Sequence, residues 1–287
     1  MAARTHESGG NLSDKKMKID LYARCWNDSE MLGFFFRHYD PIVQRYVIYD
    51  DGSTDNSVDL LKAHPRVDLR PMPKYAVQDS RILSGLAVQE TCWKESQGKA
   101  DWVIVTDIDE HLYHPFIQKY LGEMKEQGVT VIPALGFEMI SNIMPAPGSL
   151  LCEAITRGAP SGRYSKINIF CPNSINAIGY TIGRHAARPR GLVKAPASNE
   201  MYLLHYKHID FNRLLRRHKQ FLARQRKKDA EMNWGFQYSW GEERLRVEWE
   251  SINARALDSR DVNERTWAEA GGKKWWRVPT SGPVPGA

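Results

Sequence analysis

The sequence has few cysteines, no long apolar run and no apolar leader. Its 287 residues include four cysteines, Cys25, Cys92, Cys152 and Cys171, with no Cys-x-x-Cys pair among them. This spacing offers neither a disulfide framework nor a structural zinc site, so we expect a reducing, cytoplasmic environment. No stretch approaches the roughly 18 consecutive apolar residues of a membrane-spanning helix. The opening MAARTHESGGNLSDKK lacks the apolar segment of a secretory signal, and residues 1–17 are predicted to form a flexible tail.

The remaining composition is that of a globular protein with a mild basic excess. Hydrophobic residues make up 42% and charged residues 26% of the chain, and the formal net charge is +6. Residues 211–228 contain eight Lys or Arg and no acid, so the rest of the chain is close to neutral. We therefore interpret the excess as a property of one helix, which either docks on an anionic surface or is a solvated helix face, and not of the active site.

Apolar runs and helical patterns alternate through the first half of the chain. Strands are expected at 19–24, 46–49, 67–70, 102–106 and 129–132, and helices at 29–39, 58–62, 78–95 and 116–127. Such alternation predicts an α/β fold whose mainly parallel sheet is flanked by helices.

The second half has a different texture. Residues 139–197 are rich in Pro, Gly, Ser and Asn, which predicts loops and short antiparallel strands. Helices are expected at 210–228, with Asp210 as N-cap, and at 242–256. The predicted organisation is a domain at 18–210, a helical extension at 211–270 and a mobile tail at 271–287.

Two acidic clusters follow predicted strands. Asp50, Asp51 and Asp55 come after one strand, and Asp107, Asp109 and Glu110 after another. Ligands of open α/β sheets bind beyond the carboxyl ends of the strands. In extended backbone Asp107 and Asp109 project to the same face, where a hard divalent cation and a phosphate would balance their charges. The alternative is a solvated acidic turn that caps the next helix.

The segment YDDGSTDNS and two histidines are weaker candidates. Asp50 or Asp51 could accept hydrogen bonds from a nucleobase or a ribose, although a strand, a turn and a capped helix also explain the segment. His205 could bind a metal, and His185 lies in a basic Gly/Pro-rich loop that could meet phosphate. A core or surface histidine and a solvated loop are the alternatives.

Four aromatic residues, Trp234, Phe236, Tyr238 and Trp240, occur at alternating positions near the C-terminal helices. They could stack on sugar rings, but large aromatic side chains serve packing more often than binding. We therefore favour a hydrophobic seam that docks the C-terminal helices.

Taken in order, these segments resemble family 2-like glycosyltransferases of the GT-A (Rossmann-like) fold. The resemblance covers about Ile19 to Asp210 and rests on a first strand followed by Asn27-Asp28-Ser29-Glu30, then strand-DDGSTDNS, then strand-DIDE. Lys166, the Gly183-x-His185 pair and the LLHYKHID segment are similar to the subset with a DxDE motif and a downstream HY motif.

The resemblance implies a metal-dependent glycosyltransferase that uses a nucleotide-sugar donor, linked to UDP, GDP or dTDP, and a hydroxyl acceptor on a glycan, a lipid or a small molecule. Asp51 would contact the base or ribose, and the Arg24–Asn27 loop would line the nucleoside. Asp107 would lie near the ribose or the metal, Asp109 would be the main ligand of Mn²⁺ or Mg²⁺, and His205 would complete the site. Lys166 and His185 would lie near the diphosphate or the acceptor.

The catalytic base is harder to assign. The sequence lacks the ED and QxxRW signatures of processive synthases, which argues against polysaccharide synthesis. An inverting reaction, which we expect here, needs a base that deprotonates the acceptor hydroxyl. Glu138 is the best-placed carboxylate by its order in the chain, and Glu153 is second.

Two other functions compete with this one. A nucleotidyltransferase could share such a sheet, but no Gly-rich phosphate loop follows the first strand, where Arg24-Cys25-Trp26-Asn27 stands instead. A nucleic-acid or anionic-membrane binding protein could use the basic helix at 211–228. Nucleic acid is not expected as a partner, because the helix lacks the interleaved aromatics of a single-strand platform. A cytoplasmic enzyme that associates peripherally with a membrane is compatible with the glycosyltransferase hypothesis, because lipid-linked acceptors lie at the bilayer surface.

Overall fold

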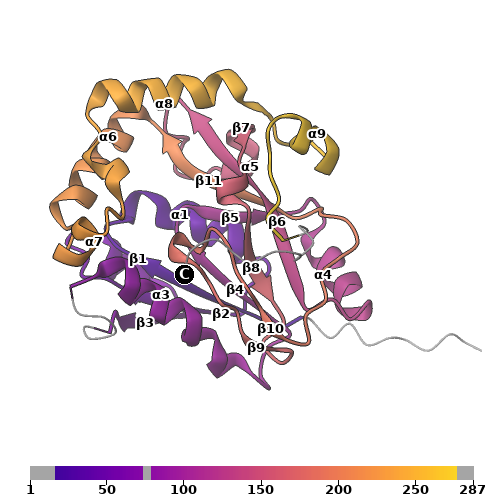
Figure 1. The fold of residues 1–287 in the computed structure, drawn as a ribbon. Helices are drawn as coiled ribbons and strands as arrows, with labels where there is room; N and C mark the ends of the chain where they lie inside the picture. The colour runs from indigo at the N-terminus through magenta and orange to yellow at the C-terminus, as the bar shows by residue number, and fades with distance from the viewer. Residues whose placement is uncertain (1–16, 74–78, 277–287) are drawn as a thin grey trace, which may run out of the picture.

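The computed structural model describes residues 17–73 and 79–276, which form one large mixed sheet covered by helices (Figure 1). The main path of the sheet has the strand order β12-β7-β6-β8-β4-β1-β2-β3, and β5 and β11 attach to it through β6. A small second sheet joins β9 (Ile175–Ala177) to β10 (Arg190–Gly191).

The N-terminal half of the sheet is parallel. β1 (Ile19–Cys25) lies between β2 (Arg45–Asp50) and β4 (Trp102–Asp107), and β2 pairs with β3 (Val67–Pro71). The order β3-β2-β1-β4 is that of a doubly wound, Rossmann-like half-sheet. Its central strands are apolar and buried because helices cover both of their faces.

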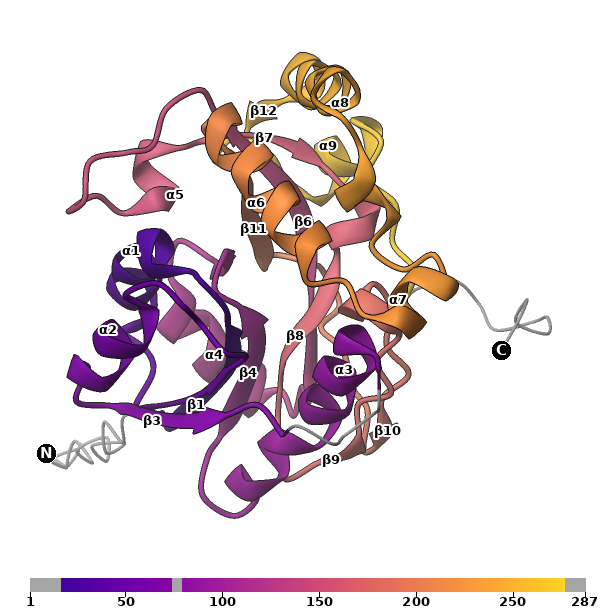
Figure 2. The same cartoon turned by 90° about the vertical axis from the view of Figure 1, so that its left-hand side faces the viewer.

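Helices flank this half-sheet on opposite faces (Figure 2). One hydrophobic cluster joins the sheet to α1 (Ser29–Tyr39), α2 (Ser57–Ala63) and α4 (Ile117–Glu126). A second cluster joins the other face to α3 (Arg81–Thr91) and the 3₁₀ helix η1 (Cys92–Ser96). Neighbouring β1 residues serve different faces, since Leu21 belongs to the first cluster and Tyr22 to the second.

The other half of the sheet is mostly antiparallel. β8 (Lys166–Phe170) lies antiparallel between β4 and β6 (Val131–Ser141), and β7 (Arg157–Pro160) extends the sheet from β6 to β12 (Leu257–Asp258). β11 (Tyr202–Ile209) runs parallel to β6 and antiparallel to β5 (Glu110–Tyr113). The α/β class is confirmed, with parallel pairing in β3-β2-β1-β4 and in β6-β11.

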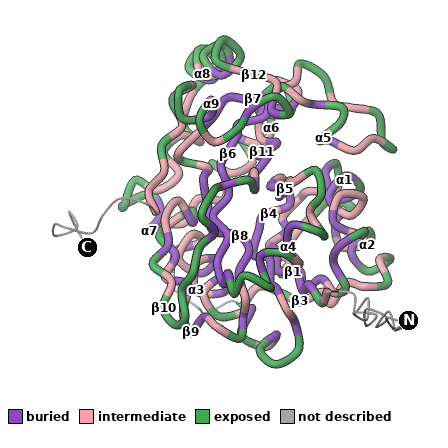
Figure 3. The backbone as a smooth tube through the Cα atoms, turned by 90° about the vertical axis from the view of Figure 1, so that its right-hand side faces the viewer, coloured by how far each residue is buried: buried purple, intermediate pink, exposed green. Residues whose placement is uncertain are grey.

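Short elements connect these strands. They are α5 (Leu151–Ala154) and the 3₁₀ helices η2 (Gly162–Tyr164) and η3 (Ile182–Arg184). Figure 3 shows the buried backbone concentrated in the sheet, with the connecting segments more exposed.

The predicted helix at 210–228 is two helices, α6 (Phe211–Ala223) and α7 (Lys227–Glu231). Asp210 caps α6 as predicted, because its carboxylate accepts from the backbone N–H of Asn212 at 2.9 Å and of Arg213 at 3.2 Å. The 3₁₀ helix η4 (Phe236–Ser239), α8 (Glu242–Arg255) and α9 (Glu264–Glu269) follow.

The C-terminal segment is built into the domain and is not an appendage. Trp267 on α9 is fully buried, and its indole N–H donates to the carbonyl of Gly136 at 2.9 Å. The tail predicted from residue 271 also packs, since the indole N–H of Trp275 donates to the carbonyl of Ser165 at 2.9 Å. The tail prediction for residues 1–16 and 277–287 lies outside the described residues.

Within the part of the chain that the structure describes, no helix has both the length and the apolar character needed to cross a bilayer.

Candidate active site

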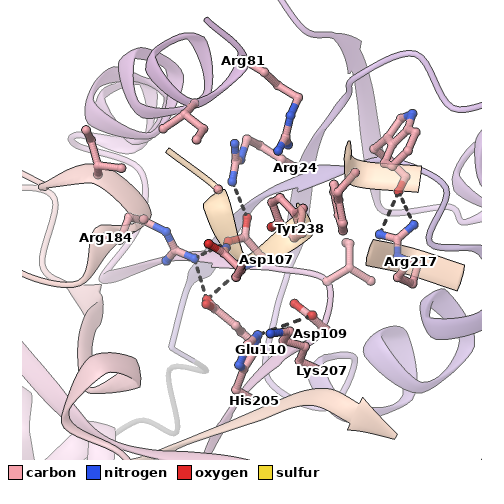
Figure 4. A pocket seen from close by; sticks show the side chains of 18 of the residues that line it. Arg24, Arg81, Asp107, Asp109, Glu110, Arg184, His205, Lys207, Arg217 and Tyr238 are labelled. Atoms are coloured by element: carbon pink, nitrogen blue, oxygen red, sulfur yellow. Dashed lines mark hydrogen bonds and ion pairs between the residues drawn. The ribbon is translucent and has the colours of Figure 1, made fainter. Parts of the chain in front are cut away.

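A cavity of about 400 Å³ opens at the carboxyl ends of the parallel strands (Figure 4). The ends of β1 and β4, the helices α3 and α6, the loop at η3, β11 and residues 233–238 line it. This volume lies in the range of small-molecule sites, and the position is where open α/β sheets bind ligands. Seven of the predicted residues line the cavity: Arg24, Asp51, Asp107, Asp109, Lys166, His185 and His205.

The DIDE segment spreads its acids in different directions. Asp107 ends β4, and its carboxylate accepts from Nη2 of Arg24 at 3.2 Å and from Nη2 of Arg184 at 2.8 Å. Asp109 lies in the turn before β5 and faces His205 instead, with 3.5 Å between Oδ2 and Nε2. The expectation that both aspartates project to one face fails because Ile108 and Asp109 form a turn and not extended strand.

Glu110, the last acid of DIDE, is a buried structural anion. It is 2% exposed and forms ion pairs with Lys166 and with Arg184, and the amide of Asn168 donates to it at 3.2 Å. Burial alone would raise the pKa of Glu110, but the charges of Arg184 and Lys166 hold it well below its ordinary value. The ammonium of Lys166, predicted to meet the diphosphate or the acceptor, is therefore engaged by Glu110.

Asp109 and His205 are the predicted metal ligands that the structure brings together. Burial opposes ionisation of Asp109, but the charge and hydrogen bond of His205 keep the pKa of this carboxyl well below its usual value. Ligand distances of about 2.1 Å would place neighbouring ligand atoms about 3 Å apart, close to the 3.5 Å seen. One carboxylate oxygen and one imidazole nitrogen suit Mn²⁺ or a similar ion, so these residues fit the predicted group.

Arg24 is held in place by α3. It crosses the helix where Gly85 leaves room, since a Cβ atom at that position would collide with Nη1 of Arg24. Gln89, one turn further along α3, lies between the two guanidiniums; with its amide oxygen facing them, it accepts from Nε of Arg24 and of Arg184 at 3.2 Å each. A buried polar network therefore fixes both arginines that hold Asp107.

Residues of the C-terminal half of the chain cover the segment that was predicted to bind the nucleoside. Arg224 pairs with Asp51 at 3.1 Å, and its guanidinium carbon lies 3.9 Å from the centre of the Trp26 ring. Asn27 and Asp50 are absent from the cavity lining among the described residues. Asn27 accepts from the backbone N–H of Thr54 at 2.7 Å, and Asp50 accepts from that of Gly52 at 3.1 Å, so both shape the loop.

His185 lines the cavity from the loop at η3. Its Nδ1 lies 2.8 Å from the carbonyl of Arg163, which can only accept, so Nδ1 carries the proton and Nε2 is an acceptor. Burial lowers the pKa of His185 to about 4, which keeps the ring neutral near pH 7. Such a nitrogen suits a hydroxyl donor better than a phosphate.

The charge of the cavity corrects the interpretation of the basic helix. Eight Lys or Arg and five carboxylates line the cavity, and Arg213 and Arg217 of α6 are among them. Arg217 binds Asp28 at 2.9 Å and the carbonyl of Asn27 at 2.7 Å. The predicted helix therefore brings part of its positive charge to the site and ties α6 to the loop after β1.

Several lining residues were not predicted. Arg81 begins α3, and among the described residues no ion pair involves its guanidinium, which lies over the ring of Phe221 at 5.2 Å. Tyr238 stacks on Phe221 with 4.8 Å between ring centres, and Trp234 and Phe236 also line the cavity. The aromatic segment that we interpreted as a seam thus forms a wall of the site. The sequence did give an indication for Arg184, because it directly precedes His185, a predicted site residue.

The two predicted base candidates lie elsewhere. Glu138 is on β6 in register with His205 but is absent from the described cavity lining. It is 9% exposed, and burial raises its pKa. Glu153 is exposed on α5.

Solved structures similar to this chain are distant. TarS 1–349 of S. aureus has 12% identity and a TM-score of 0.38, with 78% of this chain and 73% of that chain covered. Another TarS structure has 14% identity, a TM-score of 0.34 and coverage of 54% and 28%. Glucosyl-3-phosphoglycerate synthase of Mycobacterium tuberculosis, in a complex with Mn²⁺, UDP and glucosyl-3-phosphoglycerate, has 17% identity, a TM-score of 0.31 and coverage of 46% and 50%. The chain thus spans 28% of one TarS chain and half of the synthase. No curated protein matches the sequence.

The sequence pattern of one enzyme family covers most of the chain. It matches residues 27–239, from the loop after β1 to η4, and so includes DDGSTDNS, DIDE, His205 and the aromatic wall. The chain belongs to glycosyltransferase family 92.

Proposed function

We propose that this enzyme transfers a sugar from a nucleotide-sugar donor to a hydroxyl acceptor and that it requires a divalent cation. The observation that carries the proposal is the facing pair Asp109 and His205, 3.5 Å apart, in a cavity rich in cationic side chains. Anionic diphosphate and a divalent ion are the ligands that such a combination accommodates together.

In this proposal the cavity divides into three regions. Asp51, Trp26 and the backbone around Asn27 take the nucleoside, once Arg224 releases the carboxylate of Asp51. Arg24 and Arg81 face the diphosphate, because their guanidiniums lie on the α3 side of Asp107 (Figure 4). The aromatic wall at residues 234–238 covers the apolar side of the donor or acceptor sugar.

Asp109 and His205 would hold Mn²⁺ or Mg²⁺, and Asp107 would lie beside them. When bound, such an ion neutralises the diphosphate and stabilises it as a leaving group. The chain's own residues orient the donor. Arg24 and Arg184 hold Asp107 in place, and Gln89 accepts from both of these arginines. Glu110 and Lys166 form a buried ion pair beneath the site. The neutral Nε2 of His185 accepts a hydrogen bond from a hydroxyl group.

The acceptor hydroxyl must lose a proton, and Glu138 stays our predicted base for an inverting reaction. Burial raises its pKa, which favours proton uptake. If Glu138 acts in this way, Glu138→Gln lowers kcat by at least about a hundredfold and leaves the KM for the donor unchanged. Normal turnover in this variant would remove the assignment.

The non-enzyme alternative is not favoured. Arg213, Arg216, Arg217 and Arg224 of the basic helix pair with acids on the N-terminal half of the chain. These four side chains are therefore engaged within the protein and are not a free strip for nucleic acid or lipid. Absence of salt-sensitive binding to anionic vesicles in a flotation assay would exclude membrane docking.

Donor binding provides the test. Thermal unfolding is followed with UDP, GDP, dTDP and CMP and with their sugars, each in Mn²⁺ or in EDTA. A ligand that binds the native state raises Tm by mass action. We expect one nucleotide class to raise Tm only with metal, and Asp109→Asn to abolish this shift.

A matched control and a second readout sharpen the test. Asp59→Asn removes an exposed carboxylate from α2 and should leave the nucleotide shift intact. Slow hydrolysis of the accepted donor, followed by NMR of the released sugar, reports the anomer and hence inversion or retention. Failure of every nucleotide to bind, with or without metal, would refute the proposed function.

A further inference from the structure

Three polar side chains from three separate elements converge behind the cavity. They are Glu138 of β6, His208 of β11 and Glu248 of α8. One potential ligand atom from each lies within 4.8 Å of the other two. Among the described residues, no other group of three or more His, Cys, Asp or Glu side chains is as compact.

Two of these side chains, His208 and Glu248, have atoms without the hydrogen-bond partners that buried polar groups normally have. His208 is fully buried, and neither of its ring nitrogens has a hydrogen-bond partner in the described part of the chain. Oε2 of Glu248 is buried without a partner as well, 4.0 Å from Nε2 of His208. Glu138 is 9% exposed. Such groups are rare in native proteins, so the imidazole of His208 and the carboxylate of Glu248, with Glu138 beside them, call for a common ligand.

The donor set identifies the class of that ligand. One imidazole and two carboxylates are a mixed nitrogen and oxygen set, which suits Zn²⁺ or Mn²⁺ among divalent ions. A neutral imidazole is the form of histidine that binds a metal. The nearest competing cation is Lys207, but it forms no ion pair within 4.0 Å with either carboxylate among the described residues.

We propose that Glu138, His208 and Glu248 bind a divalent first-row metal ion that fastens α8 to the sheet. This site is separate from Asp109 and His205, and it excludes the role of Glu138 as catalytic base, because a carboxylate that binds a metal ion does not take up the acceptor proton. Its effect would be structural, because α8 meets the sheet through a small apolar cluster of Ile140, Ala159, Leu214, Trp249 and Ile252. An ion that joins β6, β11 and α8 would add a cross-link beside that cluster.

The proposal is tested on full-length chain carrying Asp109→Asn, which removes the carboxylate of the other candidate ligand pair. Chelator-treated protein is dialysed against Zn²⁺ or Mn²⁺, and bound metal is counted by atomic emission. We expect one ion per chain, without nucleotide, and a rise in Tm on binding. Adding Glu248→Gln should lower the affinity at least about tenfold and remove the rise in Tm.

Glu250→Gln is the matched control, since it removes an exposed carboxylate two residues along the same helix and should bind metal normally. If Glu248→Gln fails to fold, the Co²⁺ spectrum of the Asp109→Asn protein decides: d–d bands with nitrogen ligation support the site, and an aquo-ion spectrum overturns it. Unchanged affinity in folded Glu248→Gln, or no metal bound by Asp109→Asn, also overturns it. Because no donor is present, failure here leaves the proposed transferase function intact.

Discussion

Glu110→Gln isolates the buried ion cluster under the active site. The substitution keeps the shape of the side chain but removes its charge, so the buried Lys166 and Arg184 lose their shared anion. In the native chain the Glu110 carboxylate is 2% exposed, and Nη2 of Arg184 lies 2.5 Å from it. Arg184 keeps its ion pair with Asp107 at 2.8 Å, whereas Lys166 keeps no ion pair with another residue of the described part of the chain.

The magnitude follows from the uncompensated charge. Removing one partner of a buried pair costs about 3–5 kcal/mol, because the other charge stays buried. For a chain of this size each kcal/mol lowers Tm by about 2–4 °C, so we expect a decrease of roughly 6–20 °C. Adding Lys166→Met removes the stranded ammonium and should recover at least about 1 kcal/mol, which a double-mutant cycle measures.

The assay is urea unfolding at pH 7 and across the acid range. The folded pKa of Glu110 is depressed, so its stabilisation is present above the unfolded pKa and is lost progressively as pH falls from the unfolded pKa through the folded pKa. The difference between wild type and Glu110→Gln should therefore shrink below about pH 4.5. Glu123→Gln on α4 is the control, since this carboxylate is exposed and its change should cost under about 0.5 kcal/mol. A cost below about 1 kcal/mol for Glu110→Gln at pH 7 would refute the reasoning.

Three further predictions concern the site and its surroundings. Arg81→Gln should weaken donor binding by at least about tenfold in calorimetry with little change in Tm, because this guanidinium forms no ion pair in the described residues; unchanged affinity would separate Arg81 from the donor. Gly85→Ala should displace Arg24, whose guanidinium occupies the space of the new Cβ, and lower donor affinity while the fold persists; an unaltered affinity would contradict the packing. His38→Gln should make the free energy of unfolding less dependent on pH in the acid range. Burial lowers the pKa of His38 to about 4, so between pH 7 and 4.5 the wild type loses about 2–3 kcal/mol of stability through this group, and urea unfolding of the variant should not show that loss.

The sequence predicted correctly those features that depend only on residues close together in the chain. The runs at Tyr46–Tyr49 and Trp102–Thr106 are apolar because both faces of a parallel strand are covered, and both became strands. Asp210 capped its helix because a cap needs only the next turn of backbone. The placement of acids at strand ends likewise follows from the β-α alternation alone.

Interactions between distant segments were not readable. Asp107 was expected beside Asp109, but Arg24 and Arg184, which are far from it in sequence, hold its carboxylate. β11 was not predicted as a strand, because LLHYKHI contains polar residues at positions that the fold buries. His205 lies at the site, whereas His208 is buried behind it. Only the fold shows which side of the sheet each of these groups meets.

The structure changes the interpretation of the positive charge at residues 211–228 more than that of any other feature. A run of eight basic residues without an acid is typical of a surface that meets an external anion. Here the acids are supplied by the other half of the chain: Glu30 and Asp28 on the α1 side, and Asp51 after β2. Since Asp51 and Asp28 also line the cavity, whatever displaces Arg224 or Arg217 from them must offer those arginines another anion. A nucleoside diphosphate carries such a group, so we expect donor binding and the position of α6 to be coupled.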